Sequence, residues 1–300
     1  MISRFGEGFT RGKRFAFGAR LNPSRYSNRG QILFSKLFRV ALVLLILNVP
    51  AQAQVQDTIF HKTPLLTGKD ALLFAAYTLG TVLVAPIDMK IANRLQYQGT
   101  QENQFLGRAA TGFRLLGDPG SVVTAAGVYL IGRADGQRRV QALGLHSIES
   151  ILLASSLGTG IKLLAGRQRP LYDIRNPYNF QLWRGFASDQ YRSFPSGHTI
   201  AAFAFASTVT RETQFWWPHG VWYVGTVFYT GAGLVGISRM YNNMHWASDV
   251  MGGAAIGTIV GLKVVKYTHS HPGNQIDSKL IKGKRQSQIQ LNPVLFSIQF

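Results

Sequence analysis

Six apolar segments constrain the fold of this 300-residue chain more than any other feature of its sequence. They occupy residues 70–87, 119–132, 140–165, 197–210, 220–237 and 246–266. Their apolar residues come in runs or at helical spacing, not in strict alternation, and this pattern favours helices over strands. We therefore predict an all-α fold, a bundle of about six main helices with the functional site in the core between them.

The last apolar segment carries glycine at every fourth position, at Gly253, Gly257 and Gly261. Glycines at this spacing lie on one side of a helix and let a second helix approach closely. The segment is therefore predicted to pack tightly against a neighbouring helix.

The balance of charge indicates the surroundings of the bundle. Charged residues make up 15% of the chain and hydrophobic residues 46%, whereas soluble proteins have about 25% charged residues. We therefore expect the bundle to be membrane-associated or membrane-embedded. The formal net charge of +19 favours anionic lipid or a phosphorylated substrate as partner. No basic run interleaved with aromatic residues is present, so we expect no nucleic-acid partner.

The first 53 residues have the layout of a secretory leader. A basic stretch is followed by the apolar run Val40–Val49 and then by Ala51-Gln52-Ala53, as in a cleavable signal peptide. The run is too short to span a bilayer, which takes about 20 residues. The alternative is an uncleaved helix that anchors the chain at the membrane. The predicted organisation is a leader at 1–53, a helical domain at 54–267 and a polar C-terminal tail at 268–300, with a short terminal strand as one option.

The first of three polar clusters combines Lys162 with Arg169-Pro170 at the end of the third segment. Arginine offers a planar fork of donors to phosphate oxygens, and lysine offers a point charge. We expect both side chains at one end of a helix that Pro170 stops. The alternative is that they serve only the helix dipole or lipid headgroups.

The second cluster is Pro195-Ser196-Gly197-His198, directly before an apolar run. Ser196 suits a helix N-cap, and Gly197 lets backbone approach a ligand. A helix N-terminus presents free N–H groups to an anion, where His198 could donate or accept a proton. The alternative is an ordinary capped helix with an exposed histidine.

The third cluster is Ser238-Arg239 followed by His245 and Asp249. His245 and Asp249 are four residues apart, so they share one face of a helix. A carboxylate that holds one imidazole nitrogen leaves the other free to act as a nucleophile. The alternative, a charge pair on a solvated face, fits poorly with the apolar residues around it.

Together the clusters suit attack on a phosphate ester. Cations around the equatorial oxygens stabilise a transferred phosphoryl group, and Lys162, Arg169 and Arg239 can supply them. The sequence shows no acidic cluster to hold Mg²⁺ or Zn²⁺, so we expect no metal and no cofactor.

The remaining histidines suggest no second site. His146 and Glu149 are expected to form a satisfied buried pair, and His269 and His271 to be solvated.

The three clusters occur in the order K-x-x-x-x-x-x-R-P, P-S-G-H and S-R-x-x-x-x-x-H-x-x-x-D. Together they resemble the signature of the type-2 phosphatidic acid phosphatase superfamily. Bacterial non-specific acid phosphatases and vanadium haloperoxidases share this signature. The resemblance covers residues 140–266. It implies that His245 attacks phosphorus, that Asp249 orients it, and that His198 protonates the leaving group and then activates water. The implied phosphate-binding residues are Lys162, Arg169, Ser196, Gly197 and Arg239.

We expect a metal-independent phosphatase that hydrolyses phosphomonoesters or diphosphates, of lipids above all, through a phosphohistidine intermediate. The alternatives are a soluble periplasmic acid phosphatase of broad specificity, a vanadate-dependent haloperoxidase and a non-catalytic phosphate-binding protein.

The expected location is the cell envelope, with the site facing the periplasm at the inner membrane. Six full spans after an exported N-terminus would turn the site to the cytoplasm. We therefore expect that one of the first two segments does not span, or that the domain lies on the membrane. Residues 119–132 are too few for a span.

Overall fold

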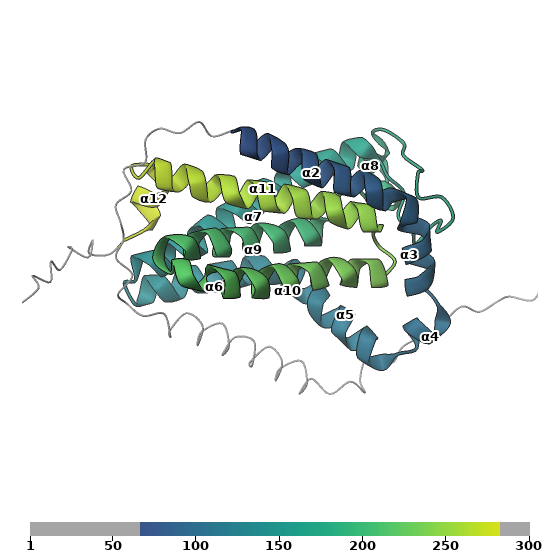
Figure 1. Ribbon diagram of the computed structural model, residues 1–300, viewed down its shortest axis with the longest axis horizontal. Coiled ribbons are helices and arrows are strands. Elements are labelled where there is room, and N and C mark those ends of the chain that lie inside the picture. The colour runs from purple at the N-terminus through teal and green to yellow at the C-terminus, as the bar shows by residue number, and fades with distance from the viewer. Residues whose placement is uncertain (1–66, 283–300) are drawn as a thin grey trace, which may run out of the picture. The chain divides into compact units, whose positions relative to one another are not determined.

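The computed structural model describes residues 67–282, which form helices joined by turns and loops, with no β-strand among them (Figure 1). The predicted all-α fold is thereby confirmed. The leader at 1–53 and the suggested terminal strand lie outside the described residues. The helices and their bounds are α2 (Gly68–Val84), α3 (Asp88–Leu95), α4 (Gln98–Gln101), α5 (Gln104–Gly117), α6 (Gly120–Ala134), α7 (Arg138–Ala165), α8 (Arg184–Ala187), α9 (Gly197–Trp216), α10 (Val221–Tyr241), α11 (Ala247–Ser270) and α12 (Gln275–Leu280).

The six predicted helices are α2, α6, α7, α9, α10 and α11, and the sequence analysis missed α5. Arg108 and Arg114 interrupt the apolar residues of α5, so its sequence did not stand out as an apolar segment. Helix α12 lies within the residues expected to form a polar tail.

Helix α9 lies at the centre of the bundle and packs against α7, α10 and α11. Small side chains allow this crowding, because Ala201, Ala204 and Ala206 are all buried along α9. Around this core, α6 packs on α7, α5 on α10, and α2 on α11 (Figure 1). The ends of α7, α9, α10 and α11 are thereby brought together on each side of the bundle.

The glycine row of α11 faces α9, as predicted. A Cβ atom at Gly253 would lie 2.7 Å from the Ser196 carbonyl oxygen, and one at Gly257 would overlap the backbone at Ile200. A Cβ at Gly261 would overlap Ser207. The two helices can approach this closely only because the three positions lack side chains.

The end of α7 differs from the prediction. The helix stops at Ala165, and Gly166 adopts a left-handed conformation with φ 57°. A Cβ at Gly166 would overlap the Gln181 carbonyl, so glycine is required here. Pro170 therefore does not end the helix, and Arg169 lies in the loop that follows it.

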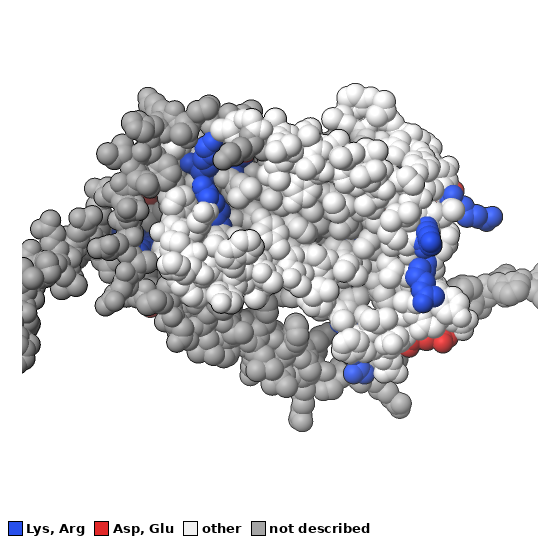
Figure 2. All heavy atoms as spheres, viewed as in Figure 1, with Lys and Arg blue, Asp and Glu red and all other residues white. Residues whose placement is uncertain are grey.

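Four helical stretches are long and apolar enough to cross a membrane: Asp70–Leu95, Arg138–Ala165, Pro218–Tyr241 and Ala247–Ser270. Helices α5 and α6, bent by 53° where they meet, make a fifth candidate as a pair. On the face shown in Figure 2, Lys and Arg side chains lie towards the two ends of the helices and not across the middle. Length and composition thus mark the chain as a membrane protein.

Candidate active site

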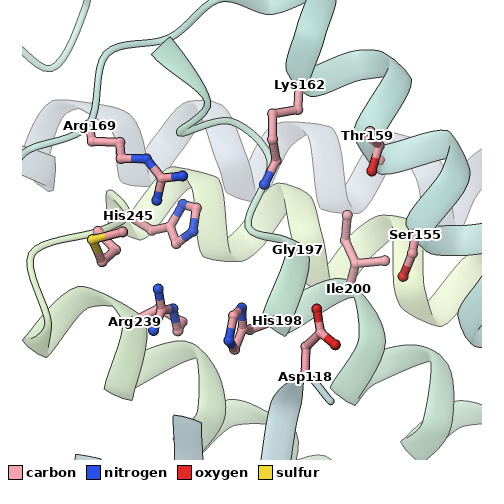
Figure 3. Close-up of a pocket in the computed structure, with 12 residues that line it drawn as sticks. Asp118, Ser155, Thr159, Lys162, Arg169, Gly197, His198, Ile200, Arg239 and His245 are labelled. Carbon is pink, nitrogen blue, oxygen red and sulfur yellow. The ribbon is translucent and has the colours of Figure 1, made fainter. Parts of the chain in front are cut away.

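A cavity of about 350 Å³ opens at one end of the bundle. There the C-terminal parts of α7 and α10 meet the N-terminal turn of α9 and the segment with Met244 and His245 that precedes α11 (Figure 3). Its lining residues are Asp118, Ser155, Gly158, Thr159, Lys162, Arg169, Gly197, His198, Ile200, Arg239, Met244 and His245. The fold therefore brings residues from all three sequence clusters to one place.

Three cations from different elements line this cavity. Lys162 comes from α7, Arg239 from α10, and Arg169 from the loop after α7 (Figure 3). Within residues 67–282, neither Lys162 nor Arg239 forms an ion pair, and the Arg239 Nε is buried without a hydrogen-bond partner. Because buried N–H groups are nearly always paired, this group is suited to an anion in the cavity.

Arg169 is held in place by Asp189. Its Nη2 lies 2.9 Å from Asp189 Oδ1, and its Nε donates to the Asp189 carbonyl at 2.9 Å. These contacts use one side of the guanidinium fork. Arg169 also lines the cavity, so the same side chain is fixed and available there.

The N-terminus of α9 supplies Gly197 and His198 to the cavity. Ser196 is the N-cap residue by position, but its side chain caps no backbone N–H group. Its Oγ instead accepts a hydrogen bond from Thr199 Oγ1 at 2.9 Å, and the residue is fully buried. Of the residues expected to bind phosphate, Ser196 alone is absent from the lining, whereas Gly197 lies against Lys162.

A backbone carbonyl sets the tautomer of His245. Its Nδ1 lies 2.7 Å from the Ser193 carbonyl oxygen, which can only accept, so Nδ1 carries the proton. Nε2 is then left with its lone pair for a reacting atom. Asp249 Oδ2 lies 3.7 Å from Nδ1, beyond hydrogen-bond distance, and His245 precedes α11 instead of lying on a face of it. The predicted pairing of the two side chains on one helical face is therefore wrong. The sequence analysis missed Ser193, because a backbone acceptor leaves no mark in the residue type.

The environment of His245 favours the neutral imidazole. Burial lowers the pKa of His245 to about 4, and the nearby Lys162 and Arg169 add to this lowering, whereas Asp249 opposes it. A neutral imidazole near pH 7 is the form that can act as a nucleophile.

Asp249 is fully buried at the first turn of α11. Its Oδ2 accepts from the Trp246 N–H at 2.8 Å and from Ser193 Oγ at 2.5 Å. Its Oδ1 accepts from Arg167 Nη1 at 2.5 Å. Asp249 therefore fixes the segment that carries His245, together with the segment that carries Ser193.

Arg167 and Asp88 support this arrangement from behind the cavity, and sequence reasoning missed both. The Arg167 guanidinium also contacts Asp88 Oδ2 at 2.8 Å and Ser248 Oγ at 2.7 Å. Both charged residues are buried, Asp88 completely. Arg167 lies in the same basic run as Arg169, but nothing in the spacing shows that one faces the cavity and the other Asp249.

The histidines away from the cavity differ from two expectations. His146 Nδ1 contacts Glu212 at 2.6 Å, whereas Glu149 has a buried Oε1 without a partner. His269 also contacts Glu212, at 3.1 Å. The predicted His146–Glu149 pair and a solvated His269 are therefore wrong, because helices distant in sequence supply the partners.

His271 is exposed, as predicted.

Comparison with known proteins agrees with this geometry. Residues 143–271 match the family model of the PAP2 superfamily. This segment, which is less than half of the chain, is similar to the PAP2 superfamily. It contains all three clusters, so the resemblance read from the motifs is confirmed.

Two curated relatives of this chain are named phosphatases. A lipid A 1-phosphatase of Porphyromonas gingivalis is 49% identical over 69 residues, which cover 23% of this chain and 15% of that protein. An undecaprenyl-diphosphatase of Sulfolobus acidocaldarius is 27% identical over 143 residues, which cover 48% of this chain and 64% of that protein. The chain thus spans less than two thirds of the length of each.

A solved structure shares the fold. The transmembrane PAP2-type phosphatidylglycerolphosphate phosphatase of Bacillus subtilis aligns with a TM-score of 0.51 at 21% identity. The alignment covers 74% of this chain and 100% of that one. The helical bundle of this chain therefore has the same overall fold as that protein.

Proposed function

We propose that this chain is a phosphatase that removes phosphate from a phosphorylated lipid, without a metal ion at the reacting phosphate, through a phosphohistidine on His245. The observation that carries the proposal is the cavity itself. Cations without ion-pair partners and the N-terminus of α9 surround the nucleophilic nitrogen of a buried, neutral histidine. Such a cavity can hold three phosphate oxygens and leave phosphorus in front of His245 Nε2.

In the first step, the lone pair of His245 Nε2 forms a P–N bond while the bond from phosphorus to the leaving oxygen breaks. Burial first, and then the nearby cations, lower the pKa of His198 to about 3 in the free cavity, and the negative charge of the bound phosphate group opposes this lowering. His198 that is protonated in the complex gives its proton to the leaving oxygen, so a neutral alcohol departs. The new imidazolium keeps its Nδ1–H on the Ser193 carbonyl, and Asp249 at 3.7 Å stabilises its positive charge.

In the second step, water attacks phosphorus from the side that the alcohol left. His198, now neutral, takes the proton of the water, the P–N bond breaks, and inorganic phosphate is released. Lys162, Arg169 and Arg239 hold the equatorial oxygens throughout. Both histidines return to their starting state, so the cycle balances.

A lipid substrate is supported by the surroundings of the cavity. The loop after α7 exposes large apolar side chains, among them Leu182, Trp183 and Phe186 at 73%, 65% and 56%. Exposed aromatic residues beside apolar helices are typical of a membrane interface. The names of both curated relatives also refer to phosphorylated lipids. The long apolar helices argue against the soluble acid phosphatase.

We propose further that the cavity faces the cell exterior and that residues 1–53 direct export. Because the cavity lies at the start of α11, the other end of this span should lie in the cytoplasm. A fluorescent protein fused after Phe300 should then fluoresce, and an alkaline phosphatase fused there should be inactive. The reverse pattern would place the cavity in the cytoplasm.

The decisive test is phosphate release from a short-chain phosphatidate in EDTA. We expect turnover by the native protein and by the control His219→Ala, which removes an exposed histidine, but none by His245→Ala. Release that survives in His245→Ala would refute the nucleophile. No release from the native protein, with aryl phosphates also inert, would favour the binding-protein reading, or the haloperoxidase if vanadate restores peroxide-dependent halide oxidation.

The intermediate can be observed directly. With ³²P-labelled p-nitrophenyl phosphate, departure of the alcohol needs little help from an acid, so His198→Ala should form the phosphohistidine and hydrolyse it slowly. We expect label on the protein that is stable in alkali and lost in acid. Label that is stable in acid, or that appears in His198→Ala/His245→Ala, would exclude His245 as its carrier.

A further inference from the structure

A second group of titratable side chains lies at the end of the bundle away from the cavity. It consists of His146 on α7, Glu149 on α7, Glu212 on α9, His269 on α11 and Asp277 on α12, and we call it the distal cluster. Figure 1 shows α12 and the C-terminal end of α11 at one end of the bundle, and α3 and α8 at the other. His146 and Lys162 are separated by 16 residues on α7, or about 24 Å along the helix.

Three of these residues converge on one point. His146 Nδ1 lies 2.6 Å from Glu212 Oε1, and His269 Nε2 lies 3.1 Å from both Glu212 oxygens. One ligand atom from each of the three residues lies within 4.8 Å of the others. In tetrahedral zinc sites with bonds of about 2.0–2.2 Å, the ligand atoms are roughly 3.3 Å apart. Small side-chain shifts would therefore admit an ion.

We propose that the distal cluster binds a divalent transition-metal ion of the zinc type through His146 Nδ1, Glu212 and His269 Nε2. Two imidazole nitrogens and one carboxylate form a donor set that suits Zn²⁺ and not Mg²⁺ or Ca²⁺, which prefer oxygen ligands. The ion would join α7, α9 and α11 at the end of the bundle opposite the phosphatase cavity.

The ligands are oriented before any ion arrives. The other nitrogen of His146, Nε2, faces Asp277 at 3.3 Å. A metal-bound histidine typically donates its second N–H to a carboxylate in this way. The His269 ring stacks on Phe215 with centroids 3.9 Å apart and an angle of 13°, which fixes its plane. Both imidazoles therefore present the required nitrogen to Glu212.

The charge of the distal cluster also calls for a cation. It contains three carboxylates, and within residues 67–282 their ion pairs are all with histidine. Glu149 adds a buried Oε1 that lacks a hydrogen-bond partner. These carboxylates thus lie close together without an ion pair to lysine or arginine among the described residues, and negative charge gathered in a partly buried place is costly. A divalent ion would compensate it.

Solvent can deliver the ion. Glu212 and His146 are buried, but the side chains of His269 and Asp277 are 26% and 15% exposed. Two of the three proposed ligands are therefore buried, and the third is partly exposed to solvent.

The test uses the full-length protein in detergent after removal of metal by a chelator, with ZnCl₂ as the only added ligand. Bound zinc is measured by mass spectrometry after gel filtration. We expect one zinc per chain in the native protein and in His245→Ala, which excludes binding at the catalytic histidine. Affinity should fall by more than about 100-fold in His269→Gln and Glu212→Gln, and by about 10–100-fold in Asp277→Asn, which removes only the partner of a ligand.

The matched control is His271→Gln, which removes the exposed histidine two residues from His269 and should bind zinc like the native protein. Zinc should also raise the thermal unfolding midpoint of the native protein but not of His269→Gln. If the ligand variants do not fold, X-ray absorption of zinc-loaded His245→Ala decides, and two imidazoles in the first shell are expected. Absence of stoichiometric zinc, zinc retained in both ligand variants, or a shell without imidazole would overturn the proposal. None of these measurements depends on phosphatase activity.

Discussion

The two ends of the helical bundle are built from the same helices but concentrate opposite charges. Helices α7, α9 and α11 each place at least one polar side chain in the phosphatase cavity or next to it and at least one in the distal cluster. Examples are Lys162 and His146 on α7, His198 and Glu212 on α9, and Asp249 and His269 on α11. The cavity gathers cations around a helix N-terminus, whereas the distal cluster gathers carboxylates around two imidazoles.

The comparison shows that each end suits a ligand whose charge is opposite in sign to its own polar groups that lack a partner. In the cavity, Lys162 and Arg239 form no ion pair with any described residue, and the cavity suits an anion. In the distal cluster, the Glu149 Oε1 has no partner, and the cluster suits a cation. In both places, leaving buried charge uncompensated is unfavourable unless a ligand arrives. Each end can therefore be disabled separately.

The largest expected effect is the loss of activity at one end of the bundle without loss of zinc binding at the other. His245→Ala should lower kcat by about 10⁴-fold or more, as for other catalytic nucleophiles, while zinc binding stays unchanged. His269→Gln should abolish zinc binding while phosphate release, assayed below the unfolding temperature, stays within about twofold of native. Steady-state kinetics and zinc stoichiometry on both variants check this. Loss of both properties in either variant would show that the ends are coupled.

The next effect concerns the support of the cavity. Arg167→Met should lower the free energy of unfolding by about 3–5 kcal/mol, because it leaves the buried carboxylates of Asp88 and Asp249 without their cation. Denaturant unfolding in mixed micelles measures the loss. The control is Arg192→Met, whose Nε donates to a backbone carbonyl of Gly185. A loss for Arg167→Met no greater than for the control would contradict the role of this ion-pair network.

Arg239→Lys should weaken inhibition by inorganic phosphate or vanadate by about 10–100-fold. The change keeps the charge but removes the guanidinium fork, and a hydrogen bond to a charged group contributes about 1.5–3 kcal/mol. Inhibition constants on the membrane-bound enzyme measure it, with Arg94→Lys on the exposed part of α3 as control. Equal inhibition constants for Arg239→Lys and native protein would remove Arg239 from the phosphate site.

The smallest expected effect is the change of kcat/KM with pH. The nucleophile is neutral His245, and its lowered pKa of about 4 keeps it neutral well below the ordinary value of 6.5. Between pH 7 and pH 5, kcat/KM should therefore fall through this group by only about a tenth, where an unperturbed histidine would lose nearly all of its neutral form. Two substrates whose phosphate groups differ in pKa separate enzyme from substrate titration. An acid limb near pH 6.5 common to both would contradict the buried, neutral state.

Much of the fold could be predicted from the sequence, and so could the three cations and two histidines that line the cavity, because both depend on local spacing. Apolar residues at helical intervals predicted six helices, and glycine at every fourth position predicted that α11 packs tightly against a neighbouring helix, which the structure shows to be α9. A helix has a fixed 3.6-residue period, so such patterns determine which side chains share a face before any packing is known.

The tertiary structure alone decided which groups face one another across helices. The proton of His245 is set by the Ser193 carbonyl, 52 residues away, and Arg167 is shared between Asp88 and Asp249. The distal cluster likewise forms only when α7, α9, α11 and α12 pack. These contacts depend on the rotation and register of each helix against its neighbours, which side-chain packing over the whole bundle determines and local sequence does not.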